Sequence, residues 1–208
     1  MKWKAKNLSK ESKIRPRKSL GQNFLIDHSI LEIIADAAQL TNADVVLEIG
    51  AGTGTLTETL AREARHVIAV EIDERLVSML RERFSSCPNV EVVKGDFLQL
   101  NLTELIPSST LISEKSKVVA NLPYYATSPI ILKLFSCAEL FERLVILVQK
   151  EVAERIVASP GSKRYGAFSV VTQYHADPEI MTVVPPEAFW PDRKSTRLNS
   201  SHLVISYA

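Results

Sequence analysis

Three glycines within five positions follow a short apolar run, and together they form the most specific local pattern in this 208-residue chain. The run Val45–Ile49 has the length and composition of a buried parallel strand. Gly50, Gly52 and Gly54 leave backbone uncovered by side chains, so a ligand can approach it closely. The pattern therefore predicts a strand, a ligand-binding turn and a helix that starts near Thr55.

Two kinds of phosphate-binding loop compete for these glycines. The dinucleotide pattern G-x-G-x-x-G/A fails, because its third glycine position holds Thr55 when counted from Gly50 and Thr57 when counted from Gly52. The phosphate-loop pattern also fails, because no Gly-Lys-Ser/Thr follows. What remains is E-x-G-x-G-x-G from Glu48, which is similar to the first motif of class I S-adenosylmethionine (SAM) methyltransferases. A plain strand-to-helix turn with glycines for packing is the alternative.

Acidic residues end the next two predicted strands. Glu71 closes the strand His66–Glu71, 21 residues after Gly50, and a carboxylate at this spacing binds ribose hydroxyls in doubly wound sheets. Asp96 follows the predicted strand Val90–Lys94. Parallel strands present their carboxyl ends at one edge, where ligands bind, so we expect the glycine turn and both acids to meet there. A solvent-exposed glutamate at a strand end is the alternative for Glu71.

A second candidate site follows a predicted strand at 117–120 and consists of Asn121, Leu122, Pro123 and Tyr124. The exocyclic amino group of a nucleobase is a poor nucleophile, because its lone pair is delocalised into the ring. The Asn121 carbonyl and a backbone carbonyl held by Pro123 can accept its two N–H bonds and aim the lone pair at a methyl donor. The ring of Tyr124 can stack on a flipped base. A proline turn without catalytic role is the alternative.

Strand and helix patterns alternate five times along the chain. This alternation predicts an α/β fold of the class I SAM-methyltransferase (Rossmann-like) type, a mostly parallel sheet with helices on both faces. Phe141–Gln149 is a further predicted strand and 180–184 a late one, whereas residues 169–175 fit neither period clearly. We divide the chain into a basic arm at 1–20, a methyltransferase domain at 21–191 and a tail at 192–208.

Composition restricts the class of protein. A hydrophobic fraction of 46% and a charged fraction of 24% are ordinary for a globular domain. No apolar run approaches the ~20 residues that span a bilayer, and the N-terminus does not resemble a signal peptide. Cys87 and Cys137 are isolated, which indicates neither a metal site nor a disulfide framework. We therefore expect a cytoplasmic protein with no membrane partner and no metal.

The first 20 residues carry a large excess of positive charge. Against Glu11 alone stand eight basic residues, while the whole chain has a net charge of only +1. Such arms often bind nucleic acid, and a solubilising tail is the alternative. The RNA-binding candidates among the arm's basic residues are Lys13, Arg15, Arg17 and Lys18.

Six segments occur in the order and spacing of the ribosomal RNA adenine dimethyltransferase family, over about residues 15 to 191. They are Gly21-Gln22-Asn23-Phe24-Leu25, Glu48-Ile49-Gly50-Ala51-Gly52, Asn121-Leu122-Pro123-Tyr124, Gln149-Lys150-Glu151-Val152, Tyr165-Gly166 and Pro185-Pro186-x-x-Phe189. The chain most resembles the branch that dimethylates two adjacent adenosines near the 3′ end of small-subunit rRNA. Macrolide-resistance methyltransferases of large-subunit rRNA share several motifs and are the enzymatic alternative. A non-catalytic RNA-binding assembly factor is the alternative from another class.

The resemblance implies SAM as the cofactor and small-subunit rRNA in a pre-ribosomal particle as the partner of a monomeric enzyme. It implies roles for these residues: Asn23 and Leu25 beside the cofactor, Gly50 and Gly52 at its methionine part, Glu71 at the ribose, Asp96 at the adenine amino group, Asn121 between cofactor and substrate, and Tyr124 and Phe189 on the two faces of the target adenine.

The chain departs from the family after Pro191. Family members usually continue as Pro-x-Pro-Lys-Val-Asp-Ser into a small helical domain, whereas residues 192–208 look foreign to that pattern. They lack helical or alternating periodicity except in a short apolar run at 203–205. We therefore expect this tail to contribute nothing to the stability of the core.

Overall fold

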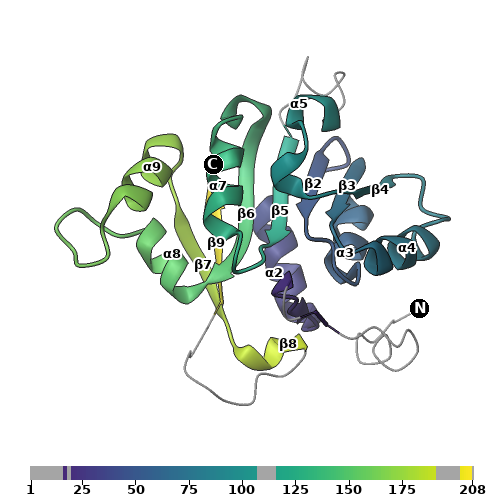
Figure 1. Ribbon diagram of the computed structural model, residues 1–208, viewed down its shortest axis with the longest axis horizontal. Coiled ribbons are helices and arrows are strands. Elements are labelled where there is room, and N and C mark those ends of the chain that lie inside the picture. The colour runs from purple at the N-terminus through teal and green to yellow at the C-terminus, as the bar shows by residue number, and fades with distance from the viewer. Residues whose placement is uncertain (1–15, 18–19, 107–115, 191–201, 208) are drawn as a thin grey trace.

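A seven-stranded sheet forms the centre of the molecule in the computed structural model, which describes residues 16–17, 20–106, 116–190 and 202–207 (Figure 1). The strand order is β4-β3-β2-β5-β6-β9-β7. The strands are β2 (Val45–Ile49), β3 (His66–Glu71), β4 (Val90–Lys94), β5 (Ser116–Asn121), β6 (Phe141–Gln149), β7 (Glu179–Val184) and β9 (His202–Tyr207).

Five of these strands run parallel. The pairs β2–β3, β2–β5, β3–β4 and β5–β6 are all parallel, and β9 pairs antiparallel with both β6 and β7. All five residues of β2 are buried, as the continuous apolar run requires of a strand covered on both faces. The structure confirms the predicted α/β fold with a mostly parallel sheet.

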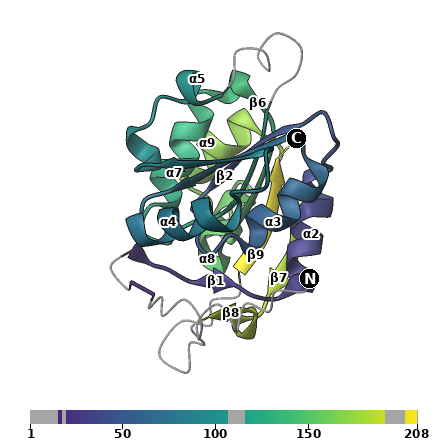
Figure 2. The ribbon, with the colours of Figure 1, turned by 90° about the vertical axis from the view of Figure 1, so that its right-hand side faces the viewer.

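Helices cover both faces of the sheet. One face packs against α2 (His28–Ala38), α3 (Thr55–Glu63) and α4 (Glu74–Arg83), and the other against α5 (Leu102–Leu105), α7 (Thr127–Phe135), α8 (Lys150–Ile156) and α9 (Ala167–His175). Figure 2 shows α2 and α3 on the opposite side of the sheet from α5, α7 and α9. Short 3-10 turns are η2 (Phe97–Gln99), η3 (Ala138–Leu140) and η4 (Pro186–Ala188).

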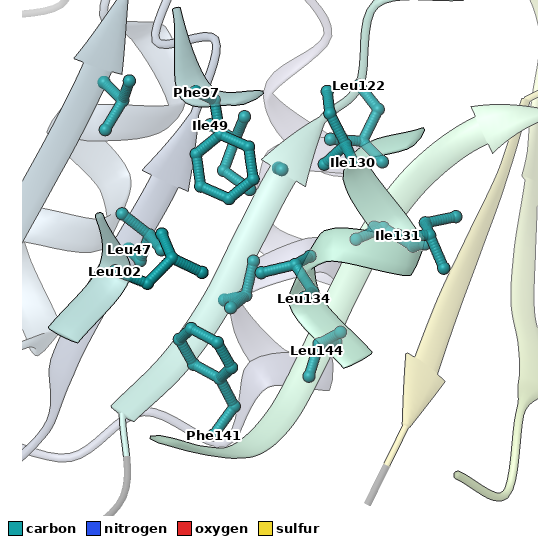
Figure 3. Packing of buried hydrophobic residues seen from close by; sticks show 14 of the residues in the cluster. Leu47, Ile49, Phe97, Leu102, Leu122, Ile130, Ile131, Leu134, Phe141 and Leu144 are labelled. Atoms are coloured by element: carbon teal, nitrogen blue, oxygen red, sulfur yellow. The ribbon is translucent and has the colours of Figure 1, made fainter. Parts of the chain in front are cut away.

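The larger core lies between the sheet and α7 (Figure 3). Leu47 and Ile49 of β2 share this cluster with Ile131 and Leu134 of α7. Leu122 belongs to the same cluster and is 2% exposed. Burying a side chain of this size stabilises the fold by about 1.5 to 3 kcal/mol, so the loop after β5 is anchored in the core at its first residue.

A separate two-stranded sheet joins two distant parts of the chain. β1 (Phe24–Leu25) pairs antiparallel with β8 (Phe189–Trp190), and Figure 2 shows the two side by side. The rings of Phe24 and Trp190 stack with centroids 5.9 Å apart. The segment before α2 is therefore held by residues from the far end of the domain.

The position of β9 bears on one expectation. We expected residues 192–208 to contribute nothing to the stability of the core, but 202–207 form a strand with neighbours on both sides, β6 and β7. The apolar run at 203–205 is too short to predict a strand by itself. The strand is defined by its pairing with β6 and β7, which no local sequence pattern reveals. This pairing argues against the expectation for 202–207, whose effect on stability stays a prediction, and residues 192–201 lie outside the described part of the chain.

No helix in the described part of the chain combines the length and apolar character needed to cross a membrane. Among the same residues, no group of three or more histidine, cysteine, aspartate or glutamate side chains is placed to hold a metal ion.

Candidate active site

The glycine turn has the backbone conformation that its sequence requires. Gly50, Gly52 and Gly54 have φ values of 77°, 60° and 79°, in the left-handed region that other residues rarely adopt. Two of them are also closely packed. A Cβ atom would lie 3.1 Å from Cδ1 of Phe24 at Gly52, and 2.7 Å from Cδ2 of Leu80 at Gly54. Helix α3 begins at Thr55, as predicted.

A cavity opens at the carboxyl edge of β2, β3 and β5, between the glycine turn, the β1 segment and the loop after β5. The sequence predicts that the glycine turn and the acidic strand ends meet at this edge. The predicted site residues that line the cavity are Asn23, Leu25, Gly50, Gly52, Glu71, Asn121, Leu122, Pro123 and Tyr124.

Two residues predicted to contact the cofactor or the target adenine lie outside the lining of this cavity. Asp96 is exposed and caps η2, where its carboxylate accepts the Leu98 N–H at 3.0 Å. Phe189 is 4% exposed and packs in the hydrophobic cluster beneath α2. The adenine-binding role of Asp96 and the stacking role of Phe189 remain predictions.

Glu71 joins the end of β3 to the glycine turn. Its Oε2 accepts the Gly52 N–H at 2.8 Å, and its Oε1 accepts the N–H groups of Ile72 and Asp73, each at 2.9 Å. Burial raises the pKa of this carboxyl, and the three backbone N–H groups oppose that rise. The residue predicted to bind ribose therefore also holds the turn in place.

Glu48 is a buried acid next to this network. It is 1% exposed, lines the cavity and accepts a hydrogen bond from Oγ1 of Thr57 at 2.6 Å. Burial, with a further contribution from Glu71, raises the pKa of Glu48 to about 8, although Thr57 opposes the shift. Glu48 is not among the site residues predicted from the sequence. Its position in the middle of an otherwise apolar strand was the signal for a special environment.

The loop after β5 is fixed by hydrogen bonds at both ends. Asn121 donates from Nδ2 to the backbone oxygen of Asn23 at 3.0 Å, and the carbonyl of Pro123 accepts from Oγ1 of Thr127 at 3.0 Å. The nitrogen and oxygen of a carboxamide lie on opposite sides of Cγ, so the first bond also orients the Asn121 oxygen. A preorganised acceptor results at the rim of the cavity.

Tyr125 lines the cavity too, and we did not predict it from the sequence. Its ring approaches Gly21, where an added Cβ would lie 3.5 Å from Cδ1, although 59% of the residue is exposed. Partial burial raises the pKa of Tyr125, and the charges of Asp96 and Glu71 raise it further. The only signal in the sequence was a second tyrosine directly after Tyr124.

A second network fastens the segment before β1 to the rim. Gln22 donates from Nε2 to Oδ2 of Asp73 at 3.0 Å and accepts the Arg17 backbone N–H at 2.7 Å. Hydrogen bonds from Arg75, and from Gln22, lower the pKa of Asp73 to about 2. Arg17 is the one RNA-binding candidate of the arm within the described residues, because Lys13, Arg15 and Lys18 lie outside them.

Comparison with known sequences gives a consistent result. A family model described as ribosomal RNA adenine dimethylase matches residues 13–198. A protein named ribosomal RNA small subunit methyltransferase A from Alkaliphilus oremlandii is 44% identical over 92% of this chain and 66% of its own length. The protein of that name from Ligilactobacillus salivarius is 49% identical over 84% of this chain and 59% of its own length. The chain thus spans less than two-thirds of these curated relatives.

Solved structures with the same fold include a dimethyladenosine transferase from Plasmodium falciparum, with a TM-score of 0.74 and 31% identity over 87% of this chain and 61% of that one. The 23S rRNA methyltransferase ErmE has a TM-score of 0.71 and 32% identity over 88% of this chain and 68% of its own.

Proposed function

Because this chain belongs to the ribosomal RNA adenine dimethylase family, we propose that it is a SAM-dependent enzyme that dimethylates N6 of two adjacent adenosines near the 3′ end of small-subunit rRNA. The observation that carries this proposal is one cavity that joins the glycine turn, Glu71 and the Asn121 loop. The names of the relatives support the small-subunit target. We further propose that the enzyme acts as a monomer on a pre-ribosomal particle.

The residues of the cavity fit SAM. Backbone at Gly50 is accessible, because a Cβ there would meet only the backbone oxygen of Asn121, at 3.7 Å. Glu71 lines the cavity at the end of β3, and a carboxylate at this place can accept hydrogen bonds from ribose hydroxyls. Gly50 and Gly52 would hold the methionine part and Glu71 the ribose. When bound, SAM supplies an electrophilic methyl group.

The Asn121 loop would position the other reactant. Oδ1 of Asn121 and the backbone carbonyl of Leu122 would accept the two N–H bonds of the adenine amino group and keep its lone pair out of the ring. Tyr124 would stack on the flipped base. Leu122 is anchored in the core, and the Asn121 amide is oriented by Asn23. This rigidity favours the loop as a preorganised substrate site.

A large-subunit target is the second candidate, because ErmE shares the fold at 32% identity. Methyl transfer from labelled SAM to small-subunit particles and to naked large-subunit rRNA separates the two. We expect N6,N6-dimethyladenosine in small-subunit rRNA only, formed far more slowly by Asn121→Ala. Label in large-subunit rRNA alone would support the second candidate. RNA binding without any transfer would point to a non-catalytic assembly factor.

A further inference from the structure

A concave basic surface lies between α8 and the loop at 159–166. Four basic and two acidic side chains line it: Lys150, Arg155, Lys163 and Arg164 with Glu151 and Glu154. Nothing in the methyl-transfer site described above uses these residues. They are candidates for contacts with a negatively charged partner.

The frame beneath this surface is held by hydrogen bonds between α8 and α9. Oγ of Ser169 donates to the backbone oxygen of Arg155 at 2.5 Å. Nε2 of Gln173 donates to the backbone oxygens of Ile156 and Ala158 at 2.8 and 2.9 Å. These bonds hold the C-terminal end of α8 against α9, on either side of the loop that carries Lys163.

Two of the four basic groups are already engaged within the protein. Arg164 forms an ion pair with Glu154, and the guanidinium of Arg155 lies 5.9 Å from the ring centroid of Phe168. Lys150 and Lys163 are exposed, and neither has an ion pair within the described part of the chain. These two lysines are the groups available to an outside anion.

The surface lies at the same sheet edge as the cavity. Asn121 at the end of β5 pairs with Leu147 of β6, and Lys150 starts α8 directly after β6. At about 3.3 Å per residue, Lys150 is some 10 Å beyond the level of Asn121 along the strand direction. Figure 1 shows α8 below β6, toward the edge where β8 lies.

We infer that Lys150 and Lys163 bind phosphates of the RNA strand that flanks the target adenosine. This inference rests on the proposed function, because a base flipped into the Asn121 loop brings its neighbouring backbone to this edge. Phosphate contacts of this kind position RNA without reading its sequence. They would fix the direction in which the strand leaves the active site, toward α8 and away from α4.

The test compares two double variants of the full chain. Lys150→Gln/Lys163→Gln removes both lysines, and Arg62→Gln/Arg65→Gln removes two exposed charges near the C-terminal end of α3, at the opposite edge of the sheet. The probe is an RNA hairpin with two adjacent unpaired adenosines, titrated at several salt concentrations. At ~0.7 to 0.9 per phosphate contact, the first variant should reduce the slope of log affinity against log salt by about 1.4 to 1.8.

Two further measurements guard the interpretation. SAM affinity by calorimetry should be unchanged in both variants, and Lys150→Arg/Lys163→Arg should keep the salt slope, since it keeps the charge. If the unmodified chain methylates RNA but the glutamine and control variants have equal salt slopes, the inference is overturned and the proposed function stands. If the unmodified chain binds no RNA, both the inference and the proposed function are overturned. Loss of binding to an acidic peptide, with RNA binding intact, would assign the surface to a protein partner and also overturn the inference.

Discussion

At the scale of single residues, the buried carboxyl of Glu48 makes stability depend on pH. Its pKa is raised from 4.5 to about 8 on folding. Between these two values the folded chain binds a proton that the unfolded chain has lost, so the free energy of unfolding falls as pH rises. Below pH 4.5 both states are protonated, and above pH 8 both are ionised, so the contribution is constant outside this window.

Glu48→Gln should therefore flatten the pH dependence of stability. Glutamine is neutral at every pH, and the decline of up to ~1.4 kcal/mol per pH unit between pH 5 and 8 should disappear. Urea denaturation at each pH unit measures it, with the exposed Glu32→Gln on α2 as the control. A variant with the same slope as the unmodified chain would show that Glu48 is ionised in the folded protein.

Glu71 and Asp96 should both contribute to SAM affinity, with different effects on folding. Losing a charge-assisted hydrogen-bond pair costs about 1.5 to 3 kcal/mol, so each alanine variant should bind SAM roughly ten- to a hundredfold more weakly. Glu71→Ala should also lower the free energy of unfolding, because the Gly52 N–H and two others lose their acceptor. Asp96→Ala should affect folding less, because exposed Asp96 accepts only the Leu98 N–H at the start of η2. Calorimetric affinities equal to that of the unmodified chain in both variants would refute the site assignment.

Asn121→Ala should act on turnover. Removing one preorganised polar group typically costs ~10² to 10³ in kcat, and RNA affinity should change little. Because the Asn121 amide also donates to Asn23, SAM affinity is measured in parallel to detect a displaced β1 segment. Unreduced turnover would remove the loop after β5 from the mechanism.

The methylation rate should depend on the aromatic ring of Tyr124 and not on its hydroxyl. Base stacking is worth about 1 to 3 kcal/mol, so Tyr124→Phe should keep most of the methylation rate and Tyr124→Ala should lose it. Single-turnover methylation of the RNA hairpin compares the two. Equal rates would mean that no base stacks on this side chain.

At the scale of elements, β9 gives the prediction that differs most from the sequence-based expectation. Deleting residues 202–208 leaves β6 and β7 without the neighbour that both pair with. We expect a loss of well over 1 kcal/mol, hence a Tm lower by more than ~2 to 4 °C. A truncated chain that melts within a degree of the full chain would restore the original expectation.

Predictability from the sequence followed the strength of the local pattern. The bounds of β2, β3 and β6 match the predicted ones, because buried parallel strands are continuous apolar runs between clear breaks. Residues 169–175 were ambiguous and belong to α9. This helix buries only part of one face, with Val171 against the core while Val170 and Tyr174 are exposed, so its helical period is weak.

At the scale of the whole molecule, strand topology explains why much of the site could be predicted. Gly50 follows β2, while Glu71 and Asn121 are the last residues of the adjacent parallel strands β3 and β5, and the carboxyl ends of such strands lie together. The direction that the chain takes after a strand end is not predicted by this rule. Asp96 turns into η2, and the bond between Gln22 and Asp73 joins segments that no local pattern relates.

The β1–β8 pair has a consequence for the order of events during folding. The glycine turn, Glu71 and Asn121 all belong to the first two-thirds of the domain. β1, in contrast, pairs with Phe189 and Trp190, which lie at the end of the domain. Closing a loop of that length is a slow, entropically costly step. During synthesis from the N-terminus, the glycine turn, Glu71 and Asn121 can thus be in place first, whereas the β1 segment with Asn23 and Leu25 finds its partner strand only after β8 has been made.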